Sequence, residues 1–66
     1  MIKTNSAKQA VEIAKDFLEL SGIPFSVITK SVSQDGKWIV EANTLGAKFR
    51  LEIDKESGEV IEYNQI

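Results

Sequence analysis

The chain has 66 residues, which is enough for one domain with a thin core, since a domain of this size buries only about 60% of the surface that its unfolded chain exposes. It contains neither cysteine nor histidine, which excludes disulfides, thiol nucleophiles and the commonest zinc ligands. Eight basic and ten acidic residues give a net charge of −2, which argues against a nucleic-acid partner. Because no apolar run is long enough for a signal peptide or a membrane span, we expect a soluble, cytoplasmic domain, with a removed signal left open.

The first predicted element is an amphipathic helix at residues 7–21. Ser6 followed three residues later by Gln9 is a capping-box pattern, which marks the start of a helix. At the other end, Gly22 is suited to a left-handed cap, and Pro24 cannot continue the helix. Apolar residues at helical spacing form the face that would pack on a core: Ala7, Ala10, Val11, Ile13, Ala14, Phe17, Leu18 and Leu20.

Two strands are expected next, at residues 25–32 and 37–43. The first is rich in β-branched residues, which favour strands. Between the two lies Asp35-Gly36, the kind of dipeptide that a two-residue type I′ hairpin turn prefers. The turn would set the register of this hairpin.

A third strand is expected at residues 47–54, where apolar and charged residues alternate as in a half-buried antiparallel strand. Its apolar face can share a core with Trp38, Val40 and Ala42 only if the connection has two or four residues. We expect a four-residue turn at residues 43–46.

The fourth strand is expected after a three-residue loop at residues 55–57 and a glycine bulge at Gly58. This glycine can take a positive φ without a Cβ clash. The expected cross-strand pairs are Leu51 with Ile61, Phe49 with Tyr63 and Arg50 with Glu62.

Together these elements predict an α+β fold, with one N-terminal helix packed on a four-stranded, alternatively three-stranded, antiparallel β-meander. The whole chain, residues 1–66, would form this single domain. Trp38 has the parity of the core face, and we expect it to pack against the helix near Phe17. The opposite face of the sheet would remain uncovered.

The uncovered sheet face is the candidate interaction surface. If Asp35-Gly36 forms the turn, then Ile28, Val32 and Ile39 lie together on this face. One interpretation is that these are scattered exposed aliphatic residues without a function, which are normal on protein surfaces. The other is a contact with a protein or peptide partner, or a weak homodimer, which would supplement a small core.

No group of residues indicates catalysis. Asp54, Glu56, Gly58 and Glu59 faintly resemble a calcium loop, but the hairpin turn already accounts for the aspartate and the glycine. The carboxylates alternate with basic residues along surface strands, whereas acid–base chemistry needs carboxyl groups in differing environments within a cleft. We therefore predict that the domain is not an enzyme and that it binds no metal, cofactor, nucleic acid or membrane.

The strand pattern resembles that of the PepSY domain. The likeness lies in the paired strands at residues 38–41 and 49–54, in the Ser-Gly turn with the following valine at residues 57–61, and in an alanine-spaced helix that ends at Gly22. It extends over nearly the whole chain. PepSY domains occur in the pro-regions of thermolysin-type metalloproteases, so the resemblance implies a PepSY-like module that interacts with peptides or proteases.

The chain also departs from the usual setting of that family, whose members sit mostly in secreted or membrane-anchored proteins. The matching positions Asp54, Ser57, Gly58 and Val60 have structural roles in a hairpin, so the resemblance carries over no inhibitory residue. The expected function is that of a small, non-enzymatic binding or regulatory domain, which would add a peptide to the edge of its first or last strand. The alternative is a homo-oligomeric structural protein that pairs identical copies of the uncovered sheet face.

Overall fold

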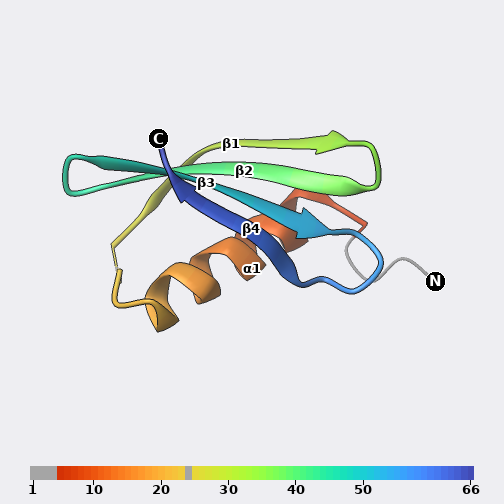
Figure 1. Ribbon diagram of the computed structural model, residues 1–66, viewed down its shortest axis with the longest axis horizontal. Coiled ribbons are helices and arrows are strands. Elements are labelled where there is room, and N and C mark those ends of the chain that lie inside the picture. Colours follow the sequence, from red (N-terminus) through yellow and green to blue (C-terminus); the bar gives the residue numbers. More distant parts are fainter. Residues whose placement is uncertain (1–4, 24) are drawn as a thin grey trace.

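The computed structural model describes residues 5–23 and 25–66. Helix α1 (Ala7–Leu20) is followed by four strands, which are β1 (Val27–Gln34), β2 (Lys37–Thr44), β3 (Ala47–Asp54) and β4 (Val60–Gln65). The strands form one antiparallel sheet in the order β1-β2-β3-β4, and α1 crosses one face of it (Figure 1). The predicted α+β meander is therefore confirmed, with four strands in the sheet.

The helix begins at the predicted N-cap, Ser6, but the side chain of Gln9 bonds to Asn5 and not to Ser6, as it would in a complete capping box. The Ser6 hydroxyl accepts a hydrogen bond from the backbone N–H of Gln9 at 3.2 Å, and the Gln9 side chain accepts one from the backbone N–H of Asn5 at 2.8 Å. These bonds satisfy amide groups that have no partner within the helix.

The helix ends at Leu20, one residue earlier than expected, with Ser21 as the C-cap. Gly22 has a φ of +86°, and the N–H of Ile23 donates to the Leu18 carbonyl at 2.8 Å. This bonding is a Schellman motif, and the left-handed cap predicted at Gly22 is confirmed. The stop predicted at Pro24 lies outside the described residues.

Both turns among the first three strands are two-residue type I′ turns. Asp35 and Gly36 have φ values of +47° and +78°, which confirms the predicted turn between β1 and β2. Leu45 and Gly46 have φ values of +43° and +85°, and the residues on either side of them, Thr44 and Ala47, pair across the two strands. The expected four-residue turn at residues 43–46 is therefore wrong. A leucine at a position that requires positive φ gave no signal for the shorter turn.

The predicted register between β3 and β4 is also wrong. The loop contains four residues, 55–58, because the N–H of Asp54 donates to the Glu59 carbonyl at 2.9 Å. A β-bulge at Ile61 adds one further residue to β4. The two additions shift the pairing by two positions, so the observed pairs are Leu51 with Tyr63, Phe49 with Gln65 and Arg50 with Asn64.

The core lies between α1 and the inward face of the sheet. The small side chains of Ala10 and Ala14 lie fully buried beside Leu18 at this interface. The residues of the sheet in the same buried cluster are Val40, Ala42, Leu51 and Ile53.

Aromatic side chains border this core. The ring of Tyr63 packs edge-on against Phe17, with ring centres 5.0 Å apart, and stacks on Phe49 at 5.5 Å. Trp38 lies on the helix face, as its parity predicts, and packs partly buried against the core. The ammonium group of Lys55 lies 5.1 Å from the centre of the Trp38 ring, a cation–π contact.

The φ of +74° at Gly58 makes this residue the test of the β3–β4 loop. We expect Gly58→Val to lower the free energy of unfolding by more than about 1 kcal/mol, because a β-branched side chain opposes the left-handed conformation. Gly58→Asn should lower it less, since asparagine tolerates positive φ. Urea denaturation followed by circular dichroism measures both, and equal midpoints for the two variants would contradict the loop conformation.

Candidate functional site

The structure places only two of the three predicted surface residues on the sheet face away from α1, here called the outer face. Val32 pairs with Ile39, as expected. Thr29, however, forms a β-bulge in β1, so that Ile28 pairs with Ala42 and packs against the core on the helix side. The prediction for Ile28 is wrong because one inserted residue reverses the alternation of side chains along a strand.

The two remaining residues do not form an exposed apolar patch. Ile39 is only 3% exposed although the helix among the described residues, α1, lies on the other face, and Val32 is 39% exposed. The cross-strand neighbour of Ile39 on β3 is Glu52, itself buried. Of the three predicted residues, only Val32 therefore remains exposed on the outer face.

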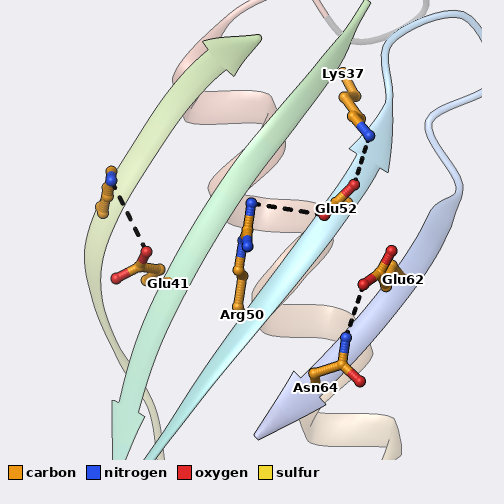
Figure 2. Close-up of polar contacts among 7 residues, drawn as sticks. Lys37, Glu41, Arg50, Glu52, Glu62 and Asn64 are labelled. Atoms are coloured by element: carbon orange, nitrogen blue, oxygen red, sulfur yellow. Dashed lines mark hydrogen bonds and ion pairs between the residues drawn. The ribbon is translucent and has the colours of Figure 1, made fainter. Parts of the chain in front are cut away.

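An ion-pair cluster of Lys37, Arg50 and Glu52 occupies the outer face (Figure 2). Lys37 Nζ lies 2.7 Å from Glu52 Oε1, and Arg50 Nη2 lies 3.7 Å from Glu52 Oε2. The Glu52 side chain is 10% exposed, while both basic side chains are more accessible. Lys30 and Glu41 form a second, longer ion pair on the same face at 3.9 Å.

The cluster shifts the titration of its members. The hydrogen bond from Lys37, together with the charges of Lys37 and Arg50, lowers the pKa of Glu52 against the opposing effect of burial. The same hydrogen bond and the charge of Glu52 raise the pKa of Lys37. A carboxylate held ionised in this way is a poor proton acceptor near neutral pH, so the geometry of Glu52 suits a structural role better than a catalytic one.

A different surface, which the sequence analysis missed, gathers exposed apolar residues at the end of the sheet that carries the β2–β3 turn. We call it the apolar end and define it by Phe25, Val27, Leu45 and Ile66, which are between 57% and 92% exposed. Figure 1 shows the β2–β3 turn projecting at this end, beyond the start of β1 and the end of β4.

Hydrogen bonds and strand pairing place these four residues at the same end of the sheet. The Thr44 hydroxyl donates a hydrogen bond to the Phe25 carbonyl, and Leu45 follows Thr44 directly. Val27 pairs with Asn43 on the neighbouring strand. The N–H of Ile66 donates to the Lys48 carbonyl at 2.7 Å, and Lys48 pairs with Asn43. Val27 and Ile66 therefore lie at the same level along the strands, at opposite edges of the sheet.

Two open hollows flank the β2–β3 turn, and Leu45 lines both. One, of about 480 Å³, is bordered by Val27, Asn43 and Lys48 together with the turn itself. The other, of about 250 Å³, lies toward the helix and is bordered mainly by Ile23, Ala47 and Phe49 in addition to the turn. The apolar end thus combines a projecting leucine with recesses on either side of it.

This surface gave little signal in the sequence because its residues come from a loop, the start of a strand, a turn and the position after β4. Single exposed apolar residues are normal, and only the fold shows that these are neighbours. The signal that the sequence did offer was a large apolar residue, Leu45, beside Gly46 within the turn expected at residues 43–46.

Two further observations concern the described part of the chain. Among residues 5–23 and 25–66, no helix is long and apolar enough to cross a membrane. The same residues contain no group of three or more acidic side chains that could hold a metal ion.

Comparison with known proteins identifies no relative of this chain. No family model matches the chain, and no curated protein or solved structure matches it either. The likeness to the PepSY domain therefore stays a resemblance of pattern.

The ion-pair cluster predicts a specific pH dependence of stability. Because the pKa of Glu52 is lowered in the folded state, its contribution is present above its ordinary value of 4.5 and is lost as the pH falls through the lowered value. Because the pKa of Lys37 is raised, its contribution is complete below 10.5 and is lost as the pH rises through the raised value. The difference in free energy of unfolding between the wild type and Glu52→Gln should therefore be largest between these limits.

Chemical denaturation at a series of pH values measures this difference. Glu12→Gln, which removes an exposed carboxylate from the helix, controls for the loss of a negative charge by itself. A difference between the wild type and Glu52→Gln that does not decrease in acid would contradict the role of the cluster.

Proposed function

We propose that this domain is a non-enzymatic protein-binding module and that its contact surface is the apolar end. The observation that carries the proposal is Leu45, which is 92% exposed at the tip of a projecting turn and has a φ of +43°. An exposed leucine adds nothing to the core of its own domain, and its backbone conformation is unfavourable for a residue with a branched side chain.

The other type I′ turn of the chain supplies the internal comparison. Asp35 occupies the corresponding position with a φ of +47°, and aspartate is among the residues that this turn prefers. The fold therefore does not require leucine at such a position. Contact between Leu45 and a partner is the role that accounts for a side chain that turn chemistry disfavours.

Neither of the surfaces expected from the sequence supports partner binding equally well. Each edge strand contains a β-bulge, at Thr29 in β1 and at Ile61 in β4, and bulges interrupt the regular row of backbone groups that an added strand needs. The outer face carries the ion-pair cluster, and Ile39 is already covered there. The apolar end has neither obstacle.

Selection from a phage-displayed random peptide library tests the proposal. We expect peptides with two or more large apolar residues to be enriched, because the hollows beside Leu45 are lined largely by apolar groups. The double variant Phe25→Ser/Val27→Ser should bind these peptides at least tenfold more weakly in a fluorescence polarisation titration. Both substituted side chains are exposed, so the fold should be retained, and circular dichroism checks this.

Ile61→Thr is the matched control, since Ile61 is an exposed aliphatic residue outside the apolar end, on the far part of β4. It should bind the selected peptides as the wild type does. Absence of enrichment, or equal affinity of the wild type and the double variant, would overturn the proposal.

A further inference from the structure

We infer that the partner at the apolar end is a second copy of this chain, an inference that rests on the proposed function. In the resulting two-fold symmetric dimer, Leu45 of each copy enters the helix-side hollow of the other. The first argument is the complementarity of the surface to itself. It carries a projecting apolar side chain and, beside it, an apolar hollow of about 250 Å³, which is larger than a leucine side chain. A two-fold axis brings each projection to the hollow of the other copy, as an isologous interface requires.

The second argument is the area available. The four residues of the apolar end together expose on the order of 600 Å² of surface, as much as the largest patches on monomers, and they are spread across the end of the sheet from Val27 to Ile66. A standard interface buries about 800 Å² on each partner, and roughly two thirds of a homodimer interface is apolar. Burial of most of the surface of these four residues would supply the larger part of the area that one such dimer needs.

The third argument is charge. Among the described residues that line the two hollows, Lys48 is the one that carries a charge. It borders the hollow of about 480 Å³ and not the helix-side hollow. Lysine has a long side chain that can reach solvent while its aliphatic part covers an apolar surface. The helix-side hollow, which receives Leu45 in this arrangement, is bordered by uncharged residues, so the contact buries no charge there.

The size of the domain adds a reason for association. Two of the three buried residues of α1 are alanines, which contribute little apolar area each. Small domains with thin cores gain from oligomerisation.

Analytical ultracentrifugation over a range of concentrations tests the inference. We expect the wild type to pass from one chain to two as the concentration rises. Leu45→Asn should raise the dimer Kd at least tenfold, while the stability of the dilute, monomeric protein stays equal or rises, because asparagine is preferred in a type I′ turn. This variant separates a loss of contact from a loss of fold, since the two effects have opposite signs.

Two controls locate the interface. Ile61→Thr, outside the apolar end, and Val32→Lys, on the outer face, should both leave the dimer Kd unchanged. Loss of the dimer in Val32→Lys with its retention in Leu45→Asn would overturn the inference in favour of the outer face.

A wild type that stays monomeric at millimolar concentration would overturn the inference while leaving the proposed function intact, provided that the selected peptides bind the apolar end. A dimer that neither Leu45→Asn nor Phe25→Ser/Val27→Ser weakens would overturn the placement. The absence of both dimer and selected peptides would overturn the inference and the proposed function together.

Discussion

The pairing register of β1, β2 and β3 is the constraint on which the rest of the structure depends. Side chains alternate along a strand, so a slip of one residue would turn Val40 and Ala42 away from α1 and expose the core. A two-residue turn fixes which residues of the two strands pair, and both turns here have the type I′ conformation that matches the twist of the strands. The packing of α1, the ion pairs of the outer face and the projection of Leu45 all follow from this register.

The sequence predicted the parts of the fold that depend on local chemistry. The N-cap at Ser6, the left-handed cap at Gly22 and the turn at Asp35-Gly36 each depend on a few neighbouring residues, and all three are confirmed. Bulges have no comparable local signature. The inserted residue Thr29 moved Ile28 to the core side, and Ile61 with the longer loop displaced the pairing of β4.

The candidate site was harder to predict than the fold, because the exposure of a side chain depends on the residues that the fold places around it. Ile39 has the parity of the uncovered face, yet side chains from adjacent strands bury it. Lys37 and Arg50 both approach Glu52, and their aliphatic stems can cover apolar surface while their charges stay near water. On the outer face, the ion pairs and the burial of Ile39 leave Val32 as an exposed aliphatic residue, whereas four exposed apolar residues lie at the apolar end.

The hydrogen bond from the Thr44 hydroxyl to the Phe25 carbonyl explains how the apolar end is held together. It joins residues that are 19 positions apart in the chain and fixes the segment before β1 beside the β2–β3 turn. Thr44 is buried, so this bond satisfies a hydroxyl that would otherwise be unpaired away from water. A surface whose backbone is fixed before binding loses less conformational freedom when a partner arrives. The bond that satisfies the Thr44 hydroxyl therefore also holds Phe25 beside Leu45, in the arrangement on which the proposed contact surface depends.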